Sequence, residues 1–305
     1  MDRFDAMRIL IAAVDGGSLS AASRSLGMPL PTVSRRVSEL EAMLGAQLVV
    51  RTSRRLQLTD AGGAFVAASR RILEDLQVAE RAASGEYDAP RGELLVTASI
   101  MFGKLHVLPV VLAFLQAYPE VKVRVVLADH VVDLTESHVD VAIRFGALPD
   151  SGLVALRLGE IRWITCASPD YLARRGVPKI PADLENHDCL AFEGLQTARI
   201  WSFADKGRTV NISIRPRFSI NTADAVIDAA VAGVGIARLT SYQTAQALRD
   251  GRLTRFLSDY SPPPVPVHLV HTGPPMLPLK LRAFLDFATP RLRADLSQIA
   301  AEHAG

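Results

Sequence analysis

The spacing of apolar residues changes near residue 90, and this change constrains the fold more than any other feature. Before it, apolar residues recur every three or four positions, most clearly at Val33, Val37, Leu40 and Leu44, as on one face of a helix. After it, short apolar or alternating runs typical of strands alternate with helical segments. Residues 85–92 have the composition of a flexible joint. The 305 residues are therefore expected to form a helical N-terminal part and an α/β part with a largely parallel sheet.

Composition and charge exclude several classes of protein. Apolar residues make up 49% and charged residues 22%, which is ordinary for a globular chain and excludes wholesale disorder. No apolar run approaches the ~20 residues that a bilayer needs, and the acidic N-terminus is a poor match to a signal peptide, so we expect a cytoplasmic protein without a membrane partner. Two cysteines, Cys166 and Cys189, form neither a disulfide framework nor a metal motif.

The first ninety residues predict four helices and a hairpin. The first helix ends at Gly16-Gly17, the second is capped by Ser18 and ends at Gly27, and the third ends at Gly45. Two short strands at 47–51 and 55–59 follow, and a long helix then reaches about residue 84. Further along, strands are expected at 94–99, 121–127, 139–145, 162–167, 189–192, 209–214, 235–239 and 265–271, and helices at 105–118, 169–175, 223–232, 242–248 and 279–296.

The third helix carries an unusual outer face. If its apolar stripe faces the core, then Pro31, Arg35 and Ser38 point outward, with Thr32, Ser34 and Glu39 on the flanks. Small, hydroxylated and cationic residues suit a helix in the DNA major groove. Residues 17–58 hold six arginines and two glutamates, whereas the whole chain has a net charge of only +2. The alternative is a small helical bundle with an incidental basic face.

The motifs extend this interpretation to a family. Residues 18–62, SLSAASRSLGMPLPTVSRRVSELEAMLGAQLVVRTSRRLQLTDAG, resemble the DNA-binding domain of LysR-type transcriptional regulators. Downstream, the segments that resemble the family's effector-binding domain are Leu108-Pro109, Tyr118-Pro119-Glu120-Val121, Asp140-Val141-Ala142-Ile143-Arg144, Ala167-Ser168-Pro169-Asp170-Tyr171-Leu172 and Ala232-Gly233-Val234-Gly235-Ile236. The similarity spans nearly the whole chain, with the domains in the family's order.

The resemblance implies an N-terminal all-α winged helix-turn-helix with a long linker helix, followed by an α/β two-lobed effector domain like periplasmic binding proteins (type 2). The expected borders are 1–60 for DNA binding, 61–85 for the dimerisation helix, 86–91 for a hinge and 92–305 for the effector domain. Lobe 1 would span about 92–162 and 268–305, and lobe 2 about 163–267. The implied partners are double-stranded operator DNA, a small effector and further copies in a homodimer or homotetramer, with RNA polymerase as a further candidate.

Specific residues are expected to bind DNA. On the third helix they are Leu30, Pro31, Thr32, Ser34, Arg35, Arg36 and Ser38, and on the hairpin, or wing, they are Arg51, Arg54 and Arg55. Two positions depart from the family, which often has serine at Pro29 and glutamine at Leu30. Leu30 lacks an adenine-reading amide and offers only apolar contact, for instance to a thymine methyl. In the linker helix, the residues that fit a coiled-coil partner are Phe65, Ile72, Leu76 and Ala79.

The effector is expected at strand ends and helix starts between the lobes. The residues are Ser99, Ile100, Met101 and Phe102, then Arg144, Phe145 and Gly146, then Asn221 and Thr222. Helix N-termini favour anions and Arg144 could grip a carboxylate, which predicts a small anionic effector. The alternatives are a different effector or none, with Ser99 and Thr222 acting only as caps and Arg144 paired with Asp129, Asp133 or Asp140.

Two other functions stay open at this point: an enzymatic α/β domain, or a solute-binding domain, fused to a DNA-binding module. The seven histidines have no metal-ligand spacing, and no GxSxG nucleophile motif is present. We therefore expect no enzyme activity, no cofactor and no metal. A redox role for Cys166 or Cys189 stays undecided.

Overall fold

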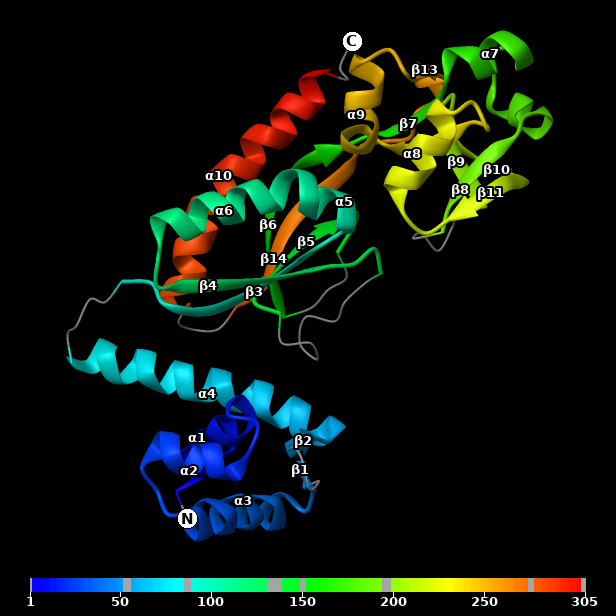
Figure 1. Ribbon diagram of the computed structural model, residues 1–305. Coiled ribbons are helices and arrows are strands. Elements are labelled where there is room, and N and C mark those ends of the chain that lie inside the picture. The colour runs from blue at the N-terminus through cyan, green and yellow to red at the C-terminus, as the bar shows by residue number, and fades with distance from the viewer. Residues whose placement is uncertain are drawn as a thin grey trace. The chain divides into compact units, whose positions relative to one another are not determined.

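The computed structural model describes residues 2–51, 56–84, 89–130, 139–148, 152–193, 199–273 and 277–302. The chain divides into two compact units, Met1–Ala89 and Pro90–Gly305. Each unit is described by itself (Figure 1).

The first unit is a helical bundle with a two-stranded wing. Its elements are α1 (Arg3–Asp15), α2 (Leu19–Leu26), α3 (Leu30–Leu44), the antiparallel strands β1 (Val49–Arg51) and β2 (Leu56–Leu58), and α4 (Asp60–Ser84). Its core joins residues of α1 to the inner faces of α3 and α4, with Leu10, Val33, Val37 and Leu40 all fully buried. This arrangement confirms the expected helix-turn-helix with a wing.

The predicted helix ends are confirmed in the first unit, and one predicted core residue is wrong. The Ser18 hydroxyl accepts the backbone N–H of Ala21 at 3.1 Å and so caps α2. Gly27 and Gly45 both end helices with φ of +64°, a conformation that costs glycine least. Leu44, predicted to face the core, is 40% exposed at the last residue of α3.

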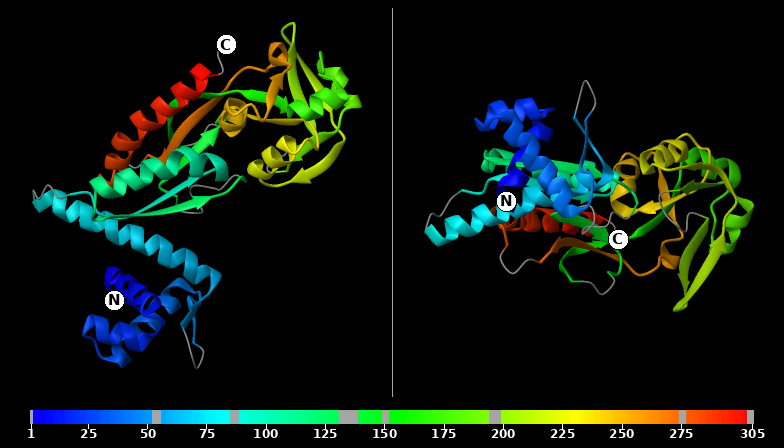
Figure 2. Two further views of the ribbon diagram at one scale, coloured as in Figure 1. Left: turned by 45° about the horizontal axis from the view of Figure 1, so that its top comes forward. Right: turned by 90° about the horizontal axis from the view of Figure 1, so that it is seen from below.

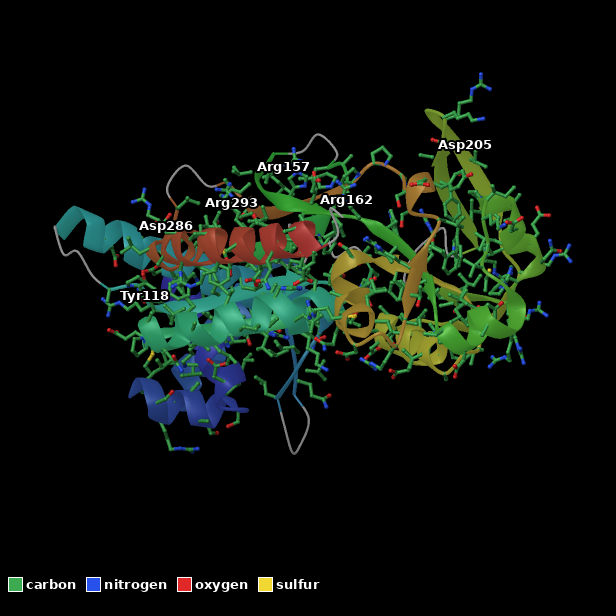
Figure 3. The ribbon with its side chains drawn as sticks, turned by 90° about the horizontal axis from the view of Figure 1, so that it is seen from above. Tyr118, Arg157, Arg162, Asp205, Asp286 and Arg293 are labelled. Atoms are coloured by element: carbon green, nitrogen blue, oxygen red, sulfur yellow. The ribbon has the colours of Figure 1, made fainter. Side chains whose placement is uncertain are left out.

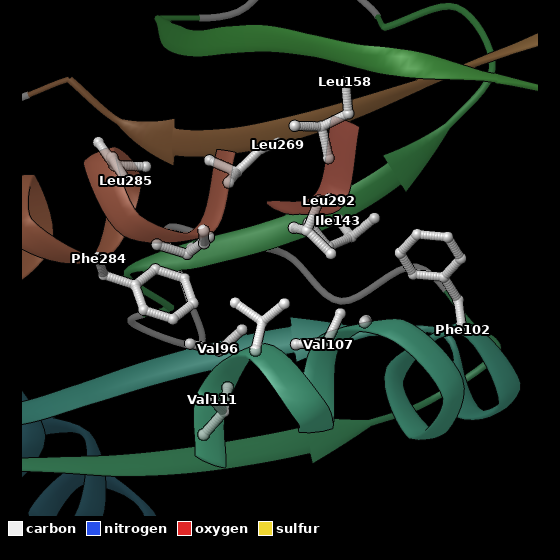
Figure 4. Packing of buried hydrophobic residues seen from close by; sticks show 14 of the residues in the cluster. Val96, Phe102, Val107, Val111, Ile143, Leu158, Leu269, Phe284, Leu285 and Leu292 are labelled. Carbon is white, nitrogen blue, oxygen red and sulfur yellow. The ribbon is translucent and has the colours of Figure 1, made fainter. Parts of the chain in front are cut away.

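Lobe 1 of the second unit is a five-stranded sheet covered on one face by helices. The sheet order is β4 (Val121–Leu127), β3 (Gly92–Ala98), β5 (Val141–Phe145), β14 (Val265–Thr272) and β6 (Leu153–Ile161). The covering helices are α5 (Ile100–Phe102), a π-helical segment (Gly103–Val107), α6 (Leu108–Ala117) and α10 (Leu279–Glu302). Figure 2 shows α6 and α10 on the same side of the sheet. Figure 4 shows their core, in which Val96, Ile143, Leu269 and Phe284 meet.

Lobe 1 corrects the expectation of a largely parallel sheet. Strand β3 pairs in parallel with β4 and β5, but β14 is antiparallel to both β5 and β6. The reason is the two-lobed topology, since β6 leads out of lobe 1 and β14 returns to it in the opposite direction. Helix α10 is fixed to β6 by Arg293, which donates to the Arg157 carbonyl at 2.9 and 3.1 Å (Figure 3).

Lobe 2 contains three small sheets and three α-helices. One sheet has the order β12 (Ala237–Thr240), β7 (Trp163–Ala167) and β13 (Thr254–Phe256), and is wholly antiparallel. The others pair β8 (Cys189–Phe192) in parallel with β11 (Pro216–Ile220), and β9 (Ile200–Asp205) antiparallel with β10 (Arg208–Ser213). The helices are α7 (Pro169–Arg175), α8 (Ala223–Val231) and α9 (Ser241–Arg249), with 3-10 turns at Pro181–Asn186 and Ser258–Tyr260.

Four strands of the second unit were not predicted: β6, β9, β11 and β13. Strand β13 has only three residues, and β11 begins at a proline although its residues alternate between apolar and polar. The predicted helix 105–118 begins with a π-helical segment, and Pro109 lies in the first turn of α6, as expected. By length and composition alone, Ile100–Ala117 is apolar enough to cross a membrane. It packs on the lobe 1 sheet, where Val107, Val111 and Phe114 are buried, so we interpret it as a core segment.

Candidate functional site

Helix α3 presents the predicted face outward. Pro31, Arg35 and Ser38 are exposed, whereas Thr32, Ser34 and Arg36 are partly exposed. The Arg35 side chain is 67% exposed and lies 3.8 Å from Glu39, and Arg36 lies 3.6 Å from the other oxygen of the same carboxylate. Exposed ion pairs of this kind are weak, so these guanidinium groups can exchange Glu39 for another anion at little cost.

The first turn of α3 is apolar and open. Pro29 precedes the helix without a side-chain capping bond, as expected from the sequence, and Pro31 lacks a backbone N–H. Leu30 lies between these two prolines and is 41% exposed. A leucine exposed at this place contributes little to the core, so its surface is available for contact with a partner.

The wing is attached to α3 by a carboxylate that the sequence analysis missed. Glu41 accepts the backbone N–H groups of Leu48 and Val49 with one oxygen, at 2.8 and 3.0 Å. The Thr59 hydroxyl donates to the Gln47 carbonyl at 2.7 Å and accepts the Gly62 N–H at 2.9 Å. Arg51 ends β1, but its side chain lies outside the described residues, as do Arg54 and Arg55.

Helix α4 packs on α1 through Val66, which belongs to the buried core of the first unit. Of the four residues expected to meet a second copy, Phe65 is half-buried against that same core. Ile72 is 42% exposed and Leu76 is partly exposed. The Ala79 side chain lies outside the described residues.

The structure brings the predicted residues after β3 to the junction of the lobes. Ser99 precedes α5, and its hydroxyl lies 3.5 Å from the Tyr242 hydroxyl of α9. Met101 packs against the cores of both lobes. Phe102 is fully buried and is therefore a core residue rather than an open contact surface.

An aromatic cluster built on Tyr242 joins α9 to lobe 1, and the sequence analysis missed it. The Tyr242 ring lies 5.2 Å from Phe102 and 6.0 Å from Phe145, centroid to centroid. Burial raises the pKa of Tyr242. Because Tyr242 lies far along the chain from both phenylalanines, only the topology of the lobes brings the three rings together.

At each of the two helix starts expected to bind an anion, a carboxylate of the chain itself accepts one backbone N–H. Asp129 accepts the Ile100 N–H at 3.0 Å, at the start of α5. Asp224 lies in the first turn of α8 and accepts the Ala225 N–H at 2.9 Å. Burial raises the pKa of Asp129, and the nearby Asp224 raises it further, so carboxylates from the two lobes lie close enough to repel each other. Asn221 is exposed and Thr222 partly exposed beside them.

Arg144 lies on the other side of the lobe 1 sheet from Phe145. Strand side chains alternate between faces, and Ile143 and Phe145 join the core under α6 whereas Ala142 belongs to a separate cluster. In the strand register, Arg144 on β5 lies opposite His268 on β14. Asp140 accepts the Leu95 N–H at 2.7 Å, and Asp133 lies outside the described residues. Gly146 follows β5 with a φ of +89°.

Both cysteines are buried free thiols. Burial raises the pKa of each to about 12, which keeps both thiols protonated and unreactive at neutral pH. The structure therefore gives neither cysteine the exposed, low-pKa setting of a redox sensor.

The comparisons with known proteins cover both units. Residues 88–293 match the family model described as LysR substrate binding domain, and residues 4–63 match the bacterial regulatory helix-turn-helix protein, lysR family. An HTH-type transcriptional regulator of Xanthomonas campestris pv. campestris is 35% identical over 298 residues, covering 96% of this chain and 87% of that protein. The HTH-type transcriptional regulator CrgA of Neisseria meningitidis is 32% identical over 293 residues, with 95% and 97% covered.

Solved structures agree with this result. The structure of CrgA, a LysR-type transcriptional regulator from Neisseria meningitidis, has a TM-score of 0.61 at 30% identity and covers 94% of this chain and 98% of that one. The full-length structure of the Vibrio cholerae virulence activator AphB has a TM-score of 0.60 at 28% identity, with the same coverage.

Proposed function

The chain belongs to the LysR family of transcriptional regulators, and from this premise we propose how it reads DNA and which chemistry its effector offers. It is a DNA-binding regulator with an effector-binding domain. Its relatives are regulators rather than enzymes. We propose that it acts in the cytoplasm on promoter DNA as a homodimer or homotetramer, with RNA polymerase as a further partner.

Helix α3 reads bases and the wing binds the backbone. The observation that carries this proposal is the outer face of α3, where Leu30, Pro31, Arg35 and Ser38 are all exposed. Arginine binds the guanine edge through two hydrogen bonds, and phosphate contacts from the wing arginines Arg51, Arg54 and Arg55 would set the register. Thr32, Ser34 and Arg36 lie at the flanks of the reading face.

The test compares two arginine substitutions on operator and random DNA. Arg35→Ala is expected to lose operator discrimination by about 1–3 kcal/mol, whereas Arg54→Ala weakens binding to all DNA and lowers the salt slope by about one. Arg8→Ala is the control, since Arg8 lies on α1 and pairs with Asp5. Equal losses on operator and random DNA for Arg35→Ala would contradict base reading by this residue.

The effector binds between the lobes and donates hydrogen bonds to them. Asp129 and Asp224 supply acceptors from opposite lobes, and Asp129 already occupies the N–H at the start of α5. The anionic effector expected from the sequence is now supported by Arg144 alone, whose strand position is on the far side from Phe145. The site residues are Ser99, Ile100, Met101, Asn221 and Thr222, with Phe102, Phe145 and Gly146 behind them.

A ligand screen separates the two effector classes. Small amines, amino acids and carboxylic acids are tested by thermal shift and then by calorimetry on the wild type, Asp224→Asn and Arg144→Ala. We expect a ligand with an ammonium or amide group, weakened at least ten-fold by Asp224→Asn and little by Arg144→Ala. Asp140→Asn is the matched control, because Asp140 also accepts a backbone N–H but lies away from α8. A carboxylic acid that depends on Arg144 would restore the anionic effector.

Helix α4, the linker helix, pairs with α4 of a second copy. The contact is centred on Ile72 and Leu76, and it reaches Phe65 on one side and Ala79 on the other. Exposed apolar residues near a 3.5-residue spacing suit a coiled coil, and Ile72 is exposed in one chain. Ile72→Asp is expected to shift the protein toward monomer in analytical ultracentrifugation. Arg70→Ala, on the same helix and paired with Asp15, is expected to leave the mass unchanged.

A further inference from the structure

The three-stranded sheet of lobe 2 carries a half-buried cation, Arg238, that has no proposed role in DNA binding or in effector binding. Arg238 lies on β12, and its guanidinium carbon is 4.9 Å from the ring centroid of Trp163 and 4.9 Å from that of Phe203. One of its N–H groups donates to the Ser202 carbonyl. Contact with two aromatic rings and a hydrogen bond to a carbonyl restrict the orientation of the planar guanidinium.

Arg238 faces away from the cleft. Its neighbours Ala237 and Leu239 belong to the core under α8, together with Ala223 and Val226. Alternation along the strand places Arg238 on the opposite face, beneath the β9–β10 hairpin that contributes Phe203. The tip of that hairpin, at Asp205, projects from lobe 2 in Figure 3.

Among the residues that the structure describes, none provides a counterion for Arg238. A guanidinium has five N–H donors, and within the described residues Arg238 makes one hydrogen bond and no ion pair. Burial lowers the pKa of Arg238 to about 10, because the positive charge is largely removed from water. Buried charges are normally paired.

A second polar side chain, Thr165, lies directly opposite Arg238 in the strand register. Thr165 on β7 is paired with Arg238 in the strand register, so the two side chains share one face at a spacing of about 5 Å between Cβ atoms. Thr165 is 6% exposed, and in the part of the chain that the structure describes its hydroxyl makes no hydrogen bond. Arg238, Trp163 and Ser202 are partly exposed, so the guanidinium end of this pair borders solvent.

We propose that Arg238 and Thr165 form a second ligand site, for a small carboxylate, on the face of lobe 2 opposite to α8. The guanidinium edge would donate two parallel hydrogen bonds to the carboxylate, and the Thr165 hydroxyl would donate a third. Trp163 and Phe203 hold the guanidinium plane and exclude water from its faces. The site is independent of the effector in the cleft, because it uses neither Asp129 nor Asp224.

Tryptophan fluorescence of the full chain tests the proposal. Sodium acetate is titrated at constant ionic strength against sodium chloride, and Trp163, which contacts Arg238, reports binding. We expect a saturable change with acetate, absent with chloride and lost in Trp163→Phe. The half-saturating concentration should rise at least ten-fold in Arg238→Met and several-fold in Thr165→Val.

The controls separate this site from the cleft and from a folding defect. Arg249→Met removes an arginine of the same lobe that is paired with Glu302 at 2.7 Å, and Asp224→Asn changes the cleft; both should titrate like the wild type. Arg238→Lys keeps the positive charge but removes the planar guanidinium, so it should bind acetate more weakly than the wild type. This variant tests the proposal even if Arg238→Met does not fold. Equal half-saturation in the wild type and in the Arg238 variants, or a change no larger than chloride gives, would overturn the proposal.

Discussion

Helix α3 and the cleft between the lobes differ in how their residues are assembled. The outer face of α3 comes from one helix of 15 residues, and the helical period alone orients each side chain. The predicted effector site draws Ser99, Phe145 and Thr222 from three separate segments, and Tyr242 from a fourth contacts the first two. A surface built on one helix can therefore be oriented from its sequence, whereas a cleft depends on strand order and on how the lobes meet.

The first prediction tests whether the wing and α4 form one rigid support for α3, and it has the largest expected effect. A Cβ added at Gly62 would lie 1.9 Å from the Leu48 carbonyl oxygen. Because that atom belongs to the backbone and cannot turn aside, Gly62→Ala should lower the free energy of unfolding of the first unit by about 3 kcal/mol or more. Urea unfolding, followed together with DNA binding, measures this loss.

The neighbouring glycine provides the matched control. A Cβ at Gly63 meets nothing within 4 Å, so Gly63→Ala should stabilise α4 by up to about 1 kcal/mol. If both variants unfold alike, the close approach of α4 to the wing does not support α3.

The second prediction sharpens the base-reading half of the comparison. If exposed Leu30 contacts a thymine methyl, replacing that thymine by deoxyuridine should cost the wild type about 0.8 kcal/mol, which is about four-fold in Kd. Each thymine of the footprinted half-sites is replaced in turn and binding is measured by fluorescence anisotropy. In Leu30→Ala the same replacement should cost nothing. A uniform response at every thymine would show that Leu30 reads none of them.

The third prediction concerns the junction of the lobes and has the smallest expected effect. His106 lies 3.4 Å from Asp295 and 4.8 Å from the Phe102 ring, and burial lowers its pKa against the opposing effect of Asp295. Below the ordinary histidine pKa of about 6.5, the unfolded chain therefore takes up the proton before the folded chain does. Stability of the second unit should fall as the pH drops from about 7 through 6.

Thermal unfolding at several pH values checks this slope in the wild type and in His106→Gln, which should flatten it. The pKa of His187 is also lowered, chiefly by burial, so a residual slope of the same sign will persist. His130→Gln, which changes an exposed histidine, is the control. An unchanged slope in His106→Gln would assign the pH dependence to other groups.

The sequence predicted much of the first unit because local patterns determine it. Ser18, Gly27 and Gly45 mark helix ends by their own chemistry, and the buried stripe of α3 was right except at Leu44. The DNA-binding roles of the exposed residues stay predictions. In the second unit, strands with clear apolar runs, such as Cys189–Phe192, were found with their bounds, but β11, which begins at Pro216, was not.

The cleft was harder to predict because its decisive contacts connect distant residues. Nothing in the sequence near Tyr242 points to Phe102, and nothing near Asp129 indicates that it caps the start of α5. The positions of Ser99 and Thr222 before their helices were predicted correctly. The anionic effector expected there stays a prediction, and nothing in the sequence indicated that Asp129 and Asp224 each accept a backbone N–H at these helix starts.

Glu41 limits how much of α3 can be exchanged with a relative to transfer DNA specificity. Its carboxylate holds the wing, and its backbone carbonyl accepts the Ala46 N–H that closes α3. Residues 30–38 can be exchanged as one segment that leaves these hydrogen bonds of Glu41 intact. In a chimera whose exchanged segment extends past residue 41, Glu41 itself is replaced. The wing would then be held by another side chain, and it would meet the DNA duplex at an altered angle.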